Sequence, residues 1–276
     1  MLAPPNSPTQ DSGEVLEART PSIRVSDETQ ELLFRARVAQ GREGLHRLTN
    51  LRATVRQAEE ELENGAEMER DVSAQISEDW LSNWREGAER VNDADVQRLW
   101  ARILKTEASR PGSISLRSLL FMRGLDRVDA ELIELLGSFV IDGEYVLKLD
   151  ELLEKEGLGL NQLLALEDMT ILTGVSSGIG GLSRSMTVRP SKPLLAQFAN
   201  KEALVLKTDA EITIDDECYV VTRVGREVLK LGDFKANVPY VEAVITLWKS
   251  RGVHMQQGKL ASKEGSQVTV TDLHDV

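Results

Sequence analysis

The chain has 276 residues, of which only 4% are aromatic, so its core must be built mainly from aliphatic side chains. Its formal net charge of −12 argues against a protein whose whole surface binds nucleic acid or an anionic membrane. The single cysteine, Cys218, excludes an intrachain disulfide and is typical of the reducing cytosol. The first residues lack a secretory leader pattern, and the apolar runs are far shorter than the ~20 residues that cross a bilayer. We therefore expect a cytoplasmic protein without membrane contact.

The N-terminal segment, residues 1–26, is rich in Pro, Ser, Thr, Asp and Glu. Such a composition buries too little apolar surface to offset the entropy lost when a chain is ordered. We expect this segment to be disordered.

A helical pattern begins at Asp27 and continues to about residue 72. Apolar residues recur in it at seven-residue spacing, with Leu48, Val55 and Leu62 in one series and Leu51 and Ala58 in another. This gives about two heptads, fewer than the three or four that indicate a coiled coil. The favoured interpretation is a helical hairpin interrupted by Gly41, Gly44 and Gly65. The alternative is a self-associating coil that uses the helices at 28–72.

Three of the four tryptophans lie close together in the sequence. Trp80 and Trp84 are four residues apart and share one helical face, and Trp100 falls on the apolar face of the next predicted helix. Such rings could line a ligand pocket or stack on a base. Their spacing, however, is what a buried helix face requires, so we expect them to pack the core.

A turn follows the second of these helices. Pro111 and Gly112 break the helical pattern, and either Ser113 or Ser115 can cap the helix that follows. The whole stretch 27–140 is therefore predicted to be a helical domain.

The pattern changes near Ile141. Short β-branched runs indicate strands at 145–149, 170–174, 185–189, 203–207, 211–214 and 218–221. Helical patterns are interleaved with them at 150–156, 161–168, 222–231 and 238–252. We predict an α+β fold, in which the mainly α-helical N-terminal domain is followed at 141–262 by a small winged-helix-like domain with a short antiparallel sheet. Residues 263–276 are predicted to be a frayed polar tail.

The sequence contains no recognisable catalytic constellation. The acids around the tryptophans have no histidine within thirty residues, so a carboxylate metal site is disfavoured. The run SSGIGG at 176–181 matches no phosphate-binding loop and is interpreted as a connecting loop. Cys218 has apolar neighbours and no histidine nearby, so a buried structural role is favoured over a nucleophile. We expect no cofactor and no enzymatic activity.

Basic residues of the C-terminal part offer a possible nucleic-acid contact. They are Arg184, Arg189 and Lys192 beside the predicted wing, and Arg223, Arg226 and Lys230 on the predicted helix at 222–231. In a winged helix such residues could contact phosphates. Glu227 and the acidic run at 215–217 oppose this, so nucleic-acid binding is not favoured.

The central stretch at 99–122 resembles the signature of an uncharacterised bacterial family, domain of unknown function 2806 (DUF2806). The resemblance covers roughly 75–230, includes the segment 221–229, and rests on Trp100, Ala101, Ile103, Leu104, Glu107, Pro111, Gly112, Ser113, Ser115, Leu116 and Arg117. The family has no established activity. Similar modules occur in bacterial proteins linked to mobile elements and phage exclusion, which implies a possible defence setting and no mechanism.

Within this motif we expect Arg117 to pair with Glu107 across the turn and fix the angle between two helices. The alternative is that these two residues bind or cleave a ligand. We predict a non-enzymatic protein-interaction or regulatory module that binds a protein partner or self-associates. The alternative function is a winged-helix DNA-binding regulator.

Overall fold

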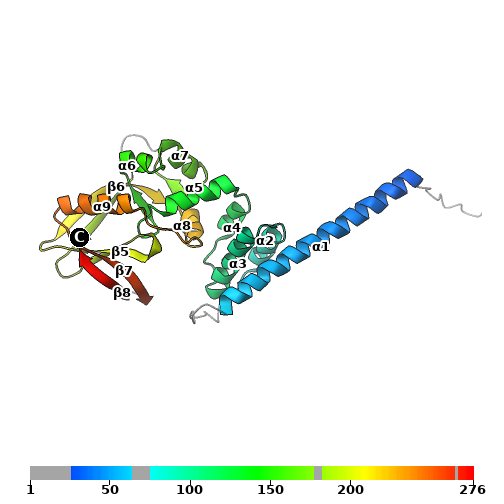
Figure 1. Ribbon diagram of the computed structural model, residues 1–276, viewed down its shortest axis with the longest axis horizontal. Helices are drawn as coiled ribbons and strands as arrows, with labels where there is room; N and C mark the ends of the chain where they lie inside the picture. The colour runs from blue at the N-terminus through cyan, green and yellow to red at the C-terminus, as the bar shows by residue number, and fades with distance from the viewer. Residues whose placement is uncertain (1–25, 64–74, 177–181, 265–266) are drawn as a thin grey trace, which may run out of the picture. The chain divides into compact units, whose positions relative to one another are not determined.

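The computed structural model describes residues 26–63, 75–176, 182–264 and 267–276. Most of the segment predicted to be disordered, Gly65 and nearly all of the 176–181 loop lie outside these ranges. The chain divides into two units, Met1–His46 and Arg47–Val276, which are described separately. Helices come first and antiparallel sheets follow, which confirms the predicted α+β class (Figure 1).

The first helix, α1, runs without interruption from Asp27 to Glu63. The predicted hairpin is therefore wrong for these residues, because neither Gly41 nor Gly44 ends the helix. A glycine in a helix interior costs only about 1 kcal/mol relative to alanine, which weakens a helix without breaking it. Pairs four residues apart, such as Arg35 and Glu31 at 2.9 Å, offset part of this cost.

The helices α2 to α5 form the rest of the predicted helical domain: α2 (Glu78–Ala88), α3 (Ala94–Ser109), α4 (Leu116–Met122) and α5 (Arg127–Gly137). Each begins at a residue that can accept hydrogen bonds from the first turn. Ser115, rather than Ser113, caps α4 by accepting a bond from the Ser118 amide at 3.3 Å. Asp126 caps α5 in a reciprocal capping box.

Two antiparallel sheets follow. In the first, the strand order is β1-β6-β2 and β3 also pairs with β6; its strands are β1 (Tyr145–Leu147), β2 (Leu172–Thr173), β3 (Ser183–Val188) and β6 (Ile212–Val221). In the second, the order is β4-β5-β7-β8; its strands are β4 (Leu194–Gln197), β5 (Glu202–Lys207), β7 (His254–Glu264) and β8 (Gln267–Asp275).

The remaining helices are interleaved with these strands. They are α6 (Asp150–Lys155), α7 (Leu160–Asp168), the 3₁₀ turn η1 (Ala199–Lys201), α8 (Arg223–Leu229) and α9 (Val238–Ser250). The chain leaves α9 through Gly252, whose φ of +86° is the left-handed conformation that glycine adopts readily after a helix.

The C-terminal architecture differs from the prediction in two respects. The prediction was a single short sheet, as in a winged helix. In the described residues, eight strands form two four-stranded sheets instead. The prediction of a frayed tail at 263–276 is also wrong for the described residues, because β8 pairs with β7 along most of its length. Backbone hydrogen bonds to a neighbouring strand can order a polar segment that has few apolar side chains of its own.

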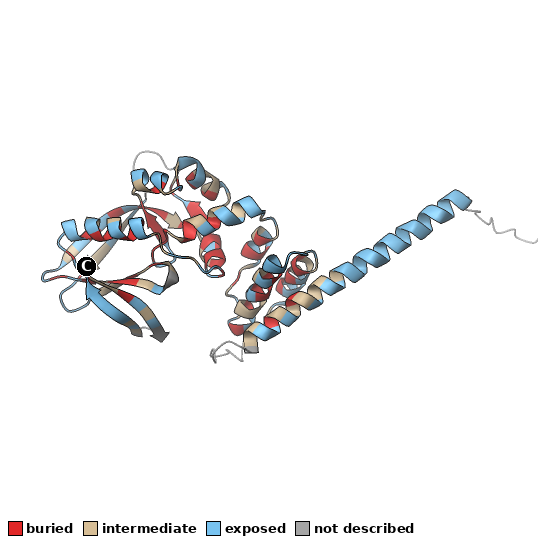
Figure 2. Cartoon of the chain, in the orientation of Figure 1, coloured by how far each residue is buried: buried red, intermediate tan, exposed pale blue. Residues whose placement is uncertain are grey.

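Within the described part of residues 47–276, the buried apolar side chains pack into a hydrophobic core (Figure 2). It includes side chains from both sides of the predicted boundary at residue 140. Tyr240 is fully buried, and its hydroxyl accepts a hydrogen bond from the Leu147 amide at 2.7 Å. Trp248 is also fully buried, and its indole N–H donates to the Asp216 carboxylate at 2.8 Å. Within the described residues, no helix is both long enough and apolar enough to span a membrane.

Candidate functional site

The three neighbouring tryptophans are buried, as the sequence predicted. Trp80, Trp84 and Trp100 are 5%, 3% and 2% exposed. Each indole of the first pair also bonds to a main-chain carbonyl, Trp80 to Ile114 at 2.8 Å and Trp84 to Trp100 at 2.9 Å. These rings therefore fix α2 against α3 and the turn after it.

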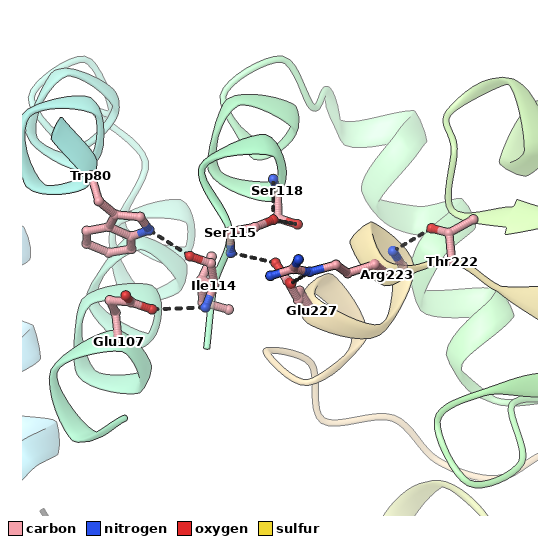
Figure 3. Close-up of polar contacts among 9 residues, drawn as sticks. Trp80, Glu107, Ile114, Ser115, Ser118, Thr222, Arg223 and Glu227 are labelled. Carbon is pink, nitrogen blue, oxygen red and sulfur yellow. Dashed lines mark hydrogen bonds and ion pairs between the residues drawn. The ribbon is translucent and has the colours of Figure 1, made fainter. Parts of the chain in front are cut away.

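The turn after α3 is held by a buried carboxylate. Glu107 is 3% exposed, and its two oxygens accept from the amides of Gly112 at 2.6 Å and Ile114 at 2.9 Å. Figure 3 shows the bond between Glu107 and Ile114. Gly112 has a φ of +84°, a left-handed conformation that is unfavourable for residues with a side chain. The predicted pair between Glu107 and Arg117 is wrong. Peptide N–H groups occupy the Glu107 carboxylate, and Arg117 is exposed.

A second buried carboxylate approaches the same segment from α8. Glu227 is 5% exposed, and it accepts from the Ser115 amide at 2.6 Å and from Arg223 Nε at 2.7 Å (Figure 3). Burial alone would raise the pKa of Glu227. The hydrogen bonds from Ser115 and Arg223 outweigh burial, so the pKa lies below the ordinary value for glutamate.

The two segments that carry the family resemblance thus meet in space. The stretch from Glu107 to Arg117 lies against α8. Within it the Ile114 amide donates to Glu107, and the next amide, that of Ser115, donates to Glu227 on α8. Sequence reasoning identified both segments but did not predict that Glu227 would join them. The spacing of Arg223 and Glu227, four residues apart on one helix, is the signal that could have marked this carboxylate.

A cavity of about 460 Å³ opens at this junction. Its lining residues are Ser115, Arg117, Thr170, Thr222, Arg223 and Val224. The lining contains two arginines and three hydroxyl groups but no carboxylate. This arrangement can hold an acceptor-rich, negatively charged group.

A larger cavity of about 620 Å³ lies between the end of α5, η1 and the end of α8. Its lining includes three cations, Lys201, Arg226 and Lys230, and three acids, Asp142, Glu144 and Asp233. Because the charges balance, the lining favours no one class of charged ligand.

Two of the six residues predicted to contact nucleic acid, Arg184 and Arg189, are paired with nearby acids. Arg184 lies 3.9 Å from Asp142 and 3.5 Å from Glu144, and its guanidinium lies 4.2 Å from the centroid of the Tyr145 ring. Arg189 pairs with Glu211 at 3.1 Å. Such pairing lowers the charge that is available to a phosphate backbone.

The other four of these residues are divided between different surroundings. Arg223 pairs with Glu227, and Arg226 and Lys230 line the larger cavity, where Arg226 also donates to the Val221 carbonyl at 3.3 Å. Lys192 lies in an exposed turn after β3. The six residues therefore lie in different local environments, and three of them are already paired with acids.

No metal centre is formed by the described residues, since nowhere among them do three or more His, Cys, Asp or Glu side chains gather. Cys218 is buried on β6, and burial raises the pKa of its thiol. A raised pKa lowers the thiolate fraction at neutral pH, so the thiol is poorly suited to nucleophilic chemistry.

The helix α1 carries exposed apolar side chains along one face. Phe34, Val38, Leu45 and Leu48 are separated by four, seven and three residues, a spacing that keeps them on one side of a helix. Phe34 is 64% exposed and Leu45 is 67% exposed. The heptad series predicted from the sequence began at Leu48 and did not include Phe34, Val38 and Leu45. Their own spacing, with Gly41 filling the gap, was the available signal.

A family model described as a protein of unknown function, DUF2806, matches residues 34–245. No curated protein and no solved structure matches the chain. The matched range contains the apolar face of α1, the tryptophan core and the junction between α4 and α8.

Proposed function

The chain belongs to the DUF2806 family, a family of unknown function, and from that premise we propose that it is a non-enzymatic interaction protein. We propose that its partner is a second copy of the same chain and that the two copies bind through α1. The observation that carries this proposal is the apolar face formed by Phe34, Val38, Leu45 and Leu48. Exposed apolar faces of this kind mark sites of protein association.

The spacing of these residues fits an antiparallel helix pair. Phe34 and Leu48 are equally distant from Gly41, and Val38 and Leu45 are nearly so. In an antiparallel pair centred on Gly41, Phe34 of one copy would lie beside Leu48 of the other, and Val38 beside Leu45. Such a pair has twofold symmetry, the commonest symmetry of soluble homo-oligomers. No side chain of its own chain lies within 4 Å of a Cβ at Gly41, so the helix surface is open there.

The energies indicate a weak dimer. The four side chains are between 38% and 67% exposed, so complete burial would stabilise the pair by about 1 kcal/mol for each. Eight side chains in a dimer contribute about 8 kcal/mol on this scale, which is similar to the ~4–15 kcal/mol cost of association. At the lower limit of that cost, a net binding free energy of about 4 kcal/mol remains, which corresponds to a Kd of about 1 mM, so we expect association to depend on concentration up to the millimolar range.

The test is the molar mass of the full chain by light scattering over a range of concentrations. We expect the mass to rise from the monomer value of 30.6 kDa towards twice that value. Leu45→Glu should hold the protein at the monomer mass, because it places a charge in the apolar interface.

Gln40→Glu is the matched control, since it adds the same charge to α1 away from the apolar face. It should dimerise like the parent chain. A parent chain that stays monomeric at high concentration, or a Leu45→Glu variant that dimerises normally, contradicts the proposal.

A further inference from the structure

The cavity between α4 and α8 contains a cation that no acid neutralises. Arg117 lines it, is exposed, and has no ion pair among the described residues. Arg223 lines the same cavity with a side chain that is 70% exposed. The Arg223 guanidinium has five N–H donors, and Glu227 accepts a hydrogen bond from one of them, the Nε–H. The terminal nitrogens of Arg223 therefore remain available to a second acceptor.

Thr170 supplies a second, independent observation. It lines the cavity and has a φ of +61°, the left-handed conformation at the end of α7. Glycine is the usual residue there, and a β-branched side chain is strained in this conformation. The Thr170 hydroxyl has no hydrogen-bond partner among the described residues. Strained residues that persist beside a cavity are frequently functional, because strain without a benefit is easily removed by substitution.

The other two hydroxyl groups already have structural roles. The Thr222 hydroxyl donates to the Thr170 carbonyl and accepts from the Gly225 amide at 3.1 Å. The Ser115 hydroxyl accepts from the Ser118 amide at 3.3 Å. The free donors that face a ligand are therefore the two arginines and Thr170, which come from α4, α8 and the loop after α7.

We propose that this cavity binds a phosphate monoester. The two guanidiniums and the Thr170 hydroxyl supply donors from three segments, which suits a group with three terminal oxygens better than a carboxylate with two. The cavity volume of about 460 Å³ leaves room for the organic part of such a ligand, and Val224 provides an apolar contact for it. This site is independent of the proposed α1 dimer.

The experiment is calorimetric titration of the full chain with phenyl phosphate, and separately with benzoate at the same ionic strength. Phenyl phosphate should bind more tightly than benzoate. Arg117→Gln should weaken phenyl phosphate binding by at least about tenfold, because a charge-assisted hydrogen bond is lost. Arg127→Gln, which removes an exposed arginine outside the cavity, should leave binding unchanged.

Thr170→Gly separates a binding role from a structural one. It relieves the left-handed strain, so the Tm of the unliganded protein should not fall, whereas phenyl phosphate binding should weaken. Leu45→Glu should bind phenyl phosphate like the parent chain. The proposal is overturned if phenyl phosphate does not bind at millimolar concentration, if benzoate binds as tightly, or if Arg117→Gln and Thr170→Gly both bind normally.

Discussion

Glu107 and Glu227 act on opposite sides of one short segment. Each is buried, and each accepts hydrogen bonds from main-chain amides of the turn before α4. A buried donor without an acceptor costs about 1–3 kcal/mol. The carboxylates therefore stabilise the turn by accepting from peptide groups, and their removal should be costly.

Glu227→Gln tests this role. We expect it to lower the free energy of unfolding by about 1–3 kcal/mol, since the charge-assisted bonds from Ser115 and Arg223 are weakened. The measurement is urea denaturation at pH 7. Glu131→Gln is the matched control, since Glu131 is an exposed partner of Arg127, and it should change stability by less than about 0.5 kcal/mol.

The same variant should alter the pH dependence of stability. The pKa of Glu227 is lowered in the folded protein, so its carboxylate contributes stability that is fully present above the pKa of unfolded glutamate. That contribution is lost as the pH falls through the folded pKa. The stability difference between the parent chain and Glu227→Gln should thus narrow below about pH 4. A constant difference from pH 7 to pH 3 would show that the charge of Glu227 is not involved.

At the scale of elements, α1 and the segment after α9 show two opposite uses of glycine. Gly44 lies within α1, where an added Cβ would meet nothing within 4 Å. Gly252 has a φ of +86° after α9, a conformation that disfavours any other residue. The effect of the same substitution should therefore differ in sign between the two positions.

Gly44→Ala should strengthen α1 by up to about 1 kcal/mol, and Gly252→Ala should destabilise the protein by a similar amount or more. Amide hydrogen exchange around residue 44 measures the first effect and should slow by a few fold. Thermal unfolding measures the second. If both substitutions destabilise, the helical conformation of α1 at Gly44 is in doubt.

Local chemistry made several elements predictable from the sequence. Ser115 and Asp126 begin helices because their own side chains bond to amides three residues later. The partners of Glu107 and Glu227 were not predictable in this way. Glu227 bonds to Ser115 across 112 residues, and no periodic pattern within either segment encodes that meeting. The pairing of β7 with β8 was missed for a similar reason, because cross-strand bonds order a polar segment without an apolar signal.

At the scale of the whole molecule, the distribution of charge bears on the DNA-binding alternative. The net charge is −12, and Arg184, Arg189 and Arg223 are each paired with acids. A protein that binds DNA non-specifically needs uncompensated cations that displace counterions from the phosphates.

We therefore expect the full chain to pass through a column of immobilised duplex DNA at low salt without retention. A basic DNA-binding protein of similar size is the positive control. Retention that weakens steeply as salt rises, and that is lost in an Arg184→Ala and Lys192→Ala double variant, would revive the DNA-binding alternative.

The bond between Glu227 and Ser115 also has a consequence for biosynthesis. Translation delivers the turn after α3 long before α8 exists, so during that interval the Ser115 amide has only water as its partner. The nascent helices must stay competent for docking until the later part of the chain emerges. Premature termination anywhere before α8 would release a product whose turn is permanently incomplete, and quality-control proteases recognise such loosened segments.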